Sequence, residues 1–143
     1  MTESPLVGTW TLVSWEVTQP DGTVRHQYGR NVVGYLAYTA DGYMFAEIMD
    51  PDRQQSDPGF PLEIAAAQTL SDPDRAHAYT TYLSYCGTYT VAGDTVTHHV
   101  HAGLIPSWTG SEQVRRFGFE DGRLLIGCGS SQVLTWERAV RHG

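Results

Sequence analysis

Short segments in which apolar and polar residues alternate run along most of the chain, and turn signals separate them. These signals are dipeptides typical of tight hairpin turns, namely Asp21-Gly22, Asp41-Gly42, Gly93-Asp94 and Asp121-Gly122. Alternation with a period of two residues indicates half-buried strands. The pattern predicts strands over residues 8–19, 34–40, 43–49, 84–92, 95–103, 112–120, 123–128 and 133–140, with a weaker strand or loop over 23–30.

A single segment carries strong helix signals. Ser71 is a good capping residue, and Pro73 suits the first turn of a helix. A helix from Arg75 to Leu83 would then place Tyr79 and Leu83 on one face. Before it, residues 50–61 are rich in Asp, Pro, Gln, Ser and Gly, which predicts an irregular loop, and residues 62–70 could carry a weaker turn or two of helix.

These elements predict an all-β fold of seven or eight antiparallel strands with one short helical insertion. A closed or nearly closed up-and-down barrel is the economical arrangement, because closure removes the edges that such a meander would expose. About eight strands also leave an interior able to hold one small ligand. We expect a single domain over residues 6–140, since no linker, repeat or low-complexity tract interrupts it.

Composition and charge narrow the possible partners. Apolar residues make up 41% of the 143 residues and aromatic residues 11%, while charged residues reach only 17%, which suits a lined cavity or a partner surface. The formal net charge of -7 argues against nucleic acid and anionic membranes as partners. The N-terminal residues lack the features of a signal peptide, so we expect a cytoplasmic protein. The sequence does not decide between a monomer and a homodimer.

The strand over 112–120 is the first candidate site. Its alternation places Gln113, Arg115 and Phe117 on one face, so Arg115 shares the interior face with an aromatic ring. In the first strand, the same alternation turns Glu16 inward, where an unpaired carboxylate would require Arg115 or His98 nearby. The grouping is either an internal ion pair or a catalytic set that binds a carbonyl, enol or carboxylate of a ligand.

Histidines cluster in the preceding strand, at His98, His99 and His101. Only His99 and His101 share a face, and no carboxylate or thiol at regular spacing completes a ligand set, so we expect no metal. His98 lies on the face of Val96 and Val100, which favours a buried, hydrogen-bonded histidine over an acid or base.

Aromatic residues form the third candidate group. They would either wall a pocket for an apolar or conjugated ligand or form ordinary core. Its members are Tyr38, Tyr85, Tyr89, Trp108 and Phe117, with Trp108 expected at the mouth. No nucleophile elbow occurs, so the sequence gives no support for nucleophilic catalysis. No Gly-rich phosphate-binding loop occurs either, and we expect no cofactor. The two cysteines, Cys86 and Cys128, have no CxxC spacing and are expected to be buried free thiols.

Several blocks, in this order along the chain, resemble those of the bacterial and fungal lipocalin-like domain family. They are the opening residues 8–14 (GTWTLVS), then 34–42 (GYLAYTADG), 85–89 (YCGTY), 96–100 (VTHHV), 106–110 (PSWTG) with Gln113 and Arg115, and the closing residues 134–138 (LTWER). The resemblance covers nearly the whole chain.

This resemblance implies a calycin-type barrel in which Trp10 packs at the closed end and Arg138 lies across its ring. Some similar small barrels act as cyclases or isomerases on polyketide-like substrates. The chain departs from the family pattern in carrying His101 and the series Tyr79, Tyr82, Tyr85 and Tyr89, which are candidates for adapting the pocket to its own ligand.

Two functions follow, with a third if the interior is packed solid. The first is an enzyme that binds a hydrophobic small molecule inside the barrel and catalyses its isomerisation or cyclisation without a cofactor, through confinement and hydrogen bonds from Arg115, Gln113, His98 or a tyrosine. The second is a non-catalytic binder or carrier that uses the same cavity. The third is an interaction module. Inward-facing polar groups favour the enzyme over the carrier.

Overall fold

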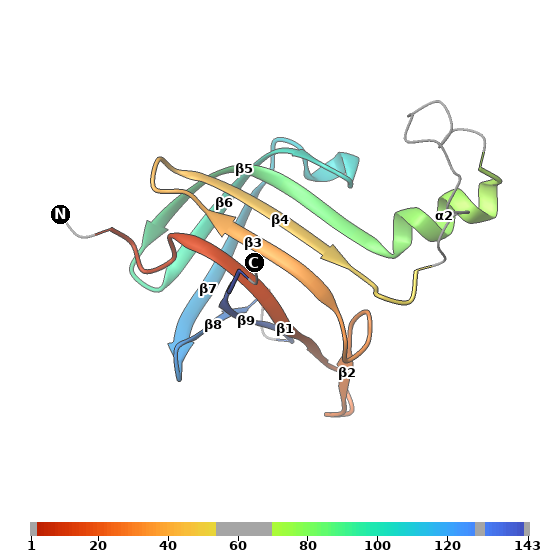
Figure 1. Ribbon diagram of the computed structural model, residues 1–143, viewed down its shortest axis with the longest axis horizontal. Helices are drawn as coiled ribbons and strands as arrows, with labels where there is room; N and C mark the ends of the chain where they lie inside the picture. Colours follow the sequence, from red (N-terminus) through yellow and green to blue (C-terminus); the bar gives the residue numbers. More distant parts are fainter. Residues whose placement is uncertain (1–2, 54–69, 128–130, 142–143) are drawn as a thin grey trace.

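The strands of the protein follow one another along the chain, and a helix lies between the fourth and fifth of them. A computed structural model describes residues 3–53, 70–127 and 131–141. The strands are β1 (Gly8–Thr18), β2 (Val24–His26), β3 (Val33–Tyr38), β4 (Tyr43–Met49), β5 (Tyr82–Ala92), β6 (Thr95–Gly103), β7 (Glu112–Glu120), β8 (Arg123–Gly127) and β9 (Gln132–Arg138). The helix α2 spans Asp72–Thr80, and a 3-10 turn, η1, spans Pro106–Trp108 (Figure 1).

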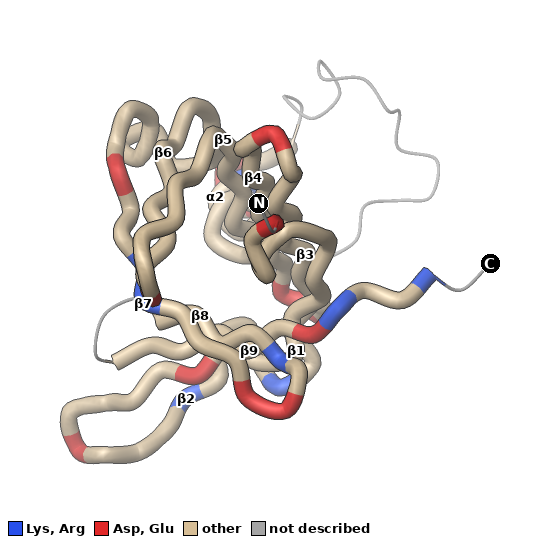
Figure 2. The backbone as a smooth tube through the Cα atoms, turned by 90° about the vertical axis from the view of Figure 1, so that its left-hand side faces the viewer, with Lys and Arg blue, Asp and Glu red and all other residues tan. Residues whose placement is uncertain are grey.

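The sheet closes on itself, as the turn pattern predicted. Neighbouring strands pair antiparallel in the order β2-β1-β3-β4-β5-β6-β7-β8-β9, and an additional pairing of β1 with β9 closes β1 and β3 to β9 into a barrel. Figure 2 shows these strands as a ring, with acidic residues in several of the turns. The short β2 lies outside the ring and pairs only with the end of β1. The all-β up-and-down barrel is therefore confirmed.

The two ends of the barrel differ in their connections. Tight turns join β3 to β4, β5 to β6 and β7 to β8 at one end. In the last of these, Asp121 and Gly122 both have positive φ, 53° and 77°, as a type I′ turn requires. The longer connections, which include α2 and η1, lie at the other end (Figure 1).

Trp10 plugs the end with the tight turns. Its side chain is 1% exposed, and its Nε1 donates to the carbonyl of Leu6 over 2.9 Å. The guanidinium of Arg138 lies 4.1 Å from the centre of the indole ring, which makes a cation–π contact. The closed end therefore has the arrangement that the family resemblance implied.

Arg138 also holds the N-terminal segment in place. Its guanidinium donates to the carbonyls of Val7, over 2.6 Å, and Pro5, over 2.9 Å. Gly8 has φ of 134°, a backbone conformation that other residues rarely adopt, and a Cβ there would also meet the end of this guanidinium. Both facts explain why a glycine precedes Trp10 by two residues.

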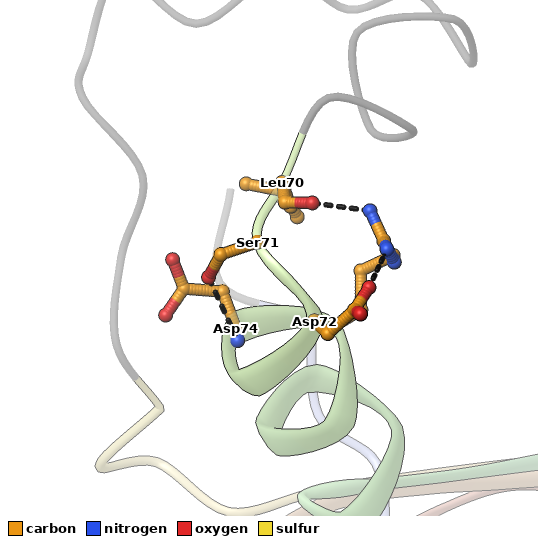
Figure 3. Close-up of polar contacts among 5 residues, drawn as sticks. Leu70, Ser71, Asp72 and Asp74 are labelled. Atoms are coloured by element: carbon orange, nitrogen blue, oxygen red, sulfur yellow. Dashed lines mark hydrogen bonds and ion pairs between the residues drawn. The ribbon is translucent and has the colours of Figure 1, made fainter.

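Helix α2 begins where its capping signals predicted. Ser71 is the N-cap, and its hydroxyl accepts from the backbone N–H of Asp74 over 3.3 Å (Figure 3). Arg75 closes the first turn by donating to Asp72 and to the carbonyl of Leu70. Among the described helices, none is long and apolar enough to cross a membrane.

The predicted end of this helix was wrong. The helix stops at Thr80 rather than Leu83, and β5 begins at Tyr82. Tyr82 and Leu83 pair with Met49 and Ile48 of β4 instead, so sheet hydrogen bonds replace helical ones at this point. Leu83 packs against the barrel core from a strand, not from a helix.

We expect Arg138→Met to lower the free energy of unfolding by about 1–2 kcal/mol, because it removes a cation–π contact and two hydrogen bonds to carbonyls. Urea denaturation would measure this. The control is Arg123→Met, which removes only a half-exposed ion pair with Glu137 of 3.5 Å and should cost less than about 0.5 kcal/mol. Equal effects of the two substitutions would contradict a special role for Arg138.

Candidate ligand-binding site

A cavity of about 480 Å³ lies inside the barrel. Aliphatic and aromatic side chains make up most of its walls, and a few polar groups interrupt them. Its lining comprises Trp15, Tyr28, Leu36, Ala46, Ile48, Tyr79, Thr80, Tyr82, Leu83, Tyr85, His98, Leu104, Ile105, Trp108, Gln113, Arg115, Ile126, Gln132, Leu134 and Trp136. Residues of α2, η1 and the start of β5 belong to this set, so the cavity extends to the end with the longer connections.

Three polar lining residues lie together on β6 and β7. His98 of β6 stands opposite Gln113 of β7 in the strand register, and both face the interior. Arg115 lies one interior position further along β7, and its Nη2 donates to Gln113 Oε1 over 2.5 Å. These three residues, which we call the polar wall, were predicted from alternation alone to face inward, and the structure brings them together.

Arg115 differs from the other lining residues in its charge. It is the only side chain with a permanent charge among the described residues around the cavity. Within the described ranges, no carboxylate lies within 4.0 Å of its guanidinium. The cavity therefore carries one positive charge without a neutralising partner from those residues.

His98 is held between two tyrosines. Its ring is 2% exposed; Nε2 lies 2.6 Å from the hydroxyl of Tyr38, and Nδ1 lies 2.9 Å from the hydroxyl of Tyr85. Burial, followed by the nearby Arg115 cation and His99, lowers the pKa of His98 to about 3. The imidazole is therefore neutral at physiological pH, with both nitrogens occupied.

The other two histidines of β6 lie outside the cavity. His99 Nδ1 is 3.3 Å from a carboxylate oxygen of Glu112, and its Nε2 is 3.2 Å from the hydroxyl of Thr90. His101 is exposed. Across residues 3–53, 70–127 and 131–141, no three His, Cys, Asp or Glu side chains come together to hold a metal ion.

Several aromatic residues line the cavity near the end with the longer connections. Trp108 of η1 meets Tyr85 edge-on, with ring centres 5.6 Å apart, as expected for a residue at the mouth. Trp15 meets Tyr28 in the same way at 5.7 Å. The hydroxyl of Tyr28 donates to the carbonyl of Thr80 over 3.0 Å, which links the β2–β3 connection to α2.

Glu16 does not belong to the site, contrary to its predicted inward orientation. The side chain is exposed and does not line the cavity. The cause is a β-bulge between Leu12 and Ser14, where the register with β9 shifts by one residue. A shift of one residue exchanges the two faces of a strand, so Trp15 points inward and Glu16 outward.

Three of the predicted aromatic residues face the interior but do not line the cavity. Tyr38 packs against Tyr89 with ring centres 4.8 Å apart, and the Tyr89 hydroxyl donates to the carbonyl of Thr39 over 2.7 Å. Phe117 packs against the core and meets Phe119 edge-on at 6.1 Å. Tyr38, Tyr89 and Phe117 are thus core near the closed end, and only Tyr85 and Trp108 of the predicted group line the cavity.

Sequence reasoning missed several lining residues. Trp15 and Gln132 line the cavity together, and Trp15 Nε1 donates to Gln132 Oε1 over 3.0 Å. Tyr28 lies in a segment without periodicity and has φ of 61°, so no pattern could have oriented it. The tyrosine series was a useful signal, because Tyr79 and Tyr82 line the cavity as well.

The cysteines were predicted to be buried free thiols. Cys86 is a free thiol, but its exposure is intermediate. Cys128 lies outside the described residues.

The closed antiparallel sheet and the cavity inside it place the protein among small β-barrel domains with an internal cavity. A family model of the lipocalin-like domain matches residues 7–139 of this chain. The chain therefore belongs to the lipocalin-like domain family, as its sequence blocks indicated. No curated protein matches the chain significantly.

Solved structures of similar fold have little sequence identity with this chain. A lipocalin-like protein from Bacteroides uniformis matches with a TM-score of 0.52 and 12% identity, over 95% of this chain and all of its own. An uncharacterised protein from Bacteroides eggerthii matches with a TM-score of 0.49 and 11% identity, over 92% and 98%. The fluorescent protein UnaG matches with a TM-score of 0.38 and 14% identity, over 93% and 96%. At such identities the first match supports the barrel fold and nothing finer.

We expect burial of neutral His98 to make the folded protein less stable at acidic pH. The unfolded chain binds a proton at His98 below about pH 6.5, while the folded protein does so only near pH 3, so stability falls as the pH drops through this window. Between pH 7 and pH 5 the loss should be about 2 kcal/mol from this residue.

Urea denaturation of wild type and His98→Gln at pH 7, 6 and 5 would test this. The variant should lack that loss, whatever its stability at pH 7. The exposed His101→Gln variant is the control and should retain the slope of the wild type. An unchanged slope in His98→Gln would show that His98 is not buried in its neutral form.

Proposed function

We propose that the protein binds a hydrophobic small molecule inside the barrel and acts as a binder or carrier. The observation that carries this proposal is the cavity of about 480 Å³ with predominantly apolar and aromatic walls. Cavities for drug-sized ligands have volumes of about 300–1,000 Å³ and similar linings. Protein interiors are normally close-packed, with few voids larger than a water molecule. A cavity of this size is therefore more typical of a binding site than of an ordinary core.

The aromatic mouth supports the same proposal. Trp15 of β1, Tyr28 of the β2–β3 connection and Trp108 of η1 all line the cavity, and each meets another aromatic ring edge-on. Flat apolar ligands gain from such rings through both burial and stacking. A solid-core interaction module would not need this arrangement.

The catalytic form of the proposal is a cofactor-free isomerisation or cyclisation of a polyketide-like intermediate. The polar wall supports it, because Arg115 and Gln113 could stabilise negative charge that develops on a carbonyl oxygen. Proton abstraction would also need a base, and the predicted candidates are poor ones. Glu16 is outside the cavity, and His98 has a low pKa and both nitrogens engaged. The binder is therefore the better supported function.

The partner proposals follow from charge and sequence. We propose a cytoplasmic protein without nucleic-acid or membrane partners, and the net charge of -7 argues against nucleic acid and anionic membrane surfaces as partners. A homodimer remains compatible with these proposals.

We expect Trp108→Ala to weaken the binding of an apolar probe by about 1–2 kcal/mol, or roughly 5- to 30-fold in Kd, because it removes a ring at the mouth. Anthracene-2-carboxamide is a suitable uncharged probe, and isothermal titration calorimetry would give the Kd. The control is Phe45→Ala, which removes a 47% exposed ring from the outer face of β4 and should leave the Kd unchanged.

Native mass spectrometry of freshly purified protein complements this titration. A co-purifying hydrophobic molecule would identify the ligand class for assays of turnover. A protein that arrives empty and binds neither the probe nor a panel of polyketide-like and fatty molecules would contradict the proposed function.

A further inference from the structure

We propose that the ligand of the barrel is a hydrophobic monoanion whose single carboxylate or ionised enol binds Arg115, with its apolar body directed toward the aromatic mouth. This inference rests on the proposed binding function and adds the charge and the orientation of the ligand. It follows from the distribution of charge around the cavity.

Among the described lining residues, only Arg115 carries a permanent charge, and most of its hydrogen-bonding capacity is unused by those residues. A guanidinium has five N–H donors, and among the described residues Arg115 uses one of them, toward Gln113. A carboxylate can accept two parallel hydrogen bonds from such a group, which is the favoured geometry for recognising planar anions. The ligand would thus supply the negative partner that the described lining lacks.

Neighbouring groups make Arg115 selective for a single negative charge. Gln113 accepts from it without neutralising it, since an amide oxygen carries no net charge. His98 stands beside it as a neutral group between Tyr38 and Tyr85, so it adds no second cation to the wall. A dianion would leave one charge unpaired in an apolar cavity, and an uncharged ligand would leave Arg115 without an anionic partner among the described residues.

The positions of these residues fix the orientation of the ligand. Arg115 stands opposite Val96, which is fully buried, and lies deeper along β7 than Gln113. Tyr28 and Trp108 line the same cavity from the longer connections at the other end of the barrel. A ligand with its anionic group at Arg115 therefore directs its apolar body toward these rings.

Two probes of the same shape separate charge from burial. Anthracene-2-carboxylate carries the anion, and anthracene-2-carboxamide replaces it with an uncharged group of nearly equal volume. Calorimetric titration of the wild-type protein at neutral pH should give a Kd for the carboxylate at least about tenfold lower than for the amide. Equal Kd values, or tighter binding of the amide, would overturn the inference while leaving the proposed binding function intact.

Substitutions then assign the preference to Arg115. Arg115→Met should raise the Kd of the carboxylate about tenfold or more and leave that of the amide within about twofold. Arg116→Met is the matched control: it removes the same charge one residue away, from an exposed ion pair with Asp94 of 2.8 Å, and should preserve the preference of the wild type.

The remaining outcomes are also decisive. A preference that survives in Arg115→Met, or disappears in Arg116→Met, would overturn the inference by showing that the general charge of the protein sets it. If Arg115→Met fails to fold, Arg115→Lys keeps the charge without the planar fork, and the wild-type comparison of the two probes still decides. If neither probe binds the wild type, this inference fails, and the proposed function fails with it when native mass spectrometry and the ligand panel also find no ligand.

Discussion

The pairing of β1 with β9 is the constraint on which the rest of the structure depends. β1 also pairs with β3 on its other side, so this one strand joins the first and last parts of the chain and leaves the barrel without an open edge. Only a closed sheet encloses a space with backbone hydrogen bonds satisfied on every side. The cavity and its polar wall exist because of this closure.

The two ends of the closed barrel have different roles. At one end, Trp10 and Arg138 seal the interior and bind the N-terminal segment, and the tight turns there leave little freedom. At the other end, the connections are longer and supply Tyr28, Tyr79 and Trp108 to the cavity. Ligand preference can therefore change through these connections without disturbing the residues that hold the barrel closed.

Alternation along the strands predicted the barrel and the polar wall, because a period of two is a local property of the chain. It placed His98, Gln113 and Arg115 on the interior face correctly. It failed for Glu16 and missed Trp15, since a β-bulge depends on how β1 fits against β9 and leaves no mark in the alternation itself.

A second limit concerns depth. Alternation assigns a residue to a face of the sheet, but it does not say how far along the barrel the residue lies. Tyr38, Tyr89 and Phe117 do face inward, yet they fill the core near the closed end rather than line the cavity. Depth follows from the strand register around the whole barrel, and long-range pairing of this kind lies beyond what one sequence segment can show.

The state of His98 bears most directly on what the cavity can do. A histidine that served as a base would need a pKa near neutrality and a nitrogen free to accept a proton. Here the tyrosine hydroxyls engage both nitrogens, and burial beside Arg115 disfavours the cation. The ring instead lets a polar group sit deep in an apolar barrel without a second positive charge. Among the described lining residues, Arg115 alone carries a permanent charge, which is the arrangement expected of a site that selects and orients a ligand.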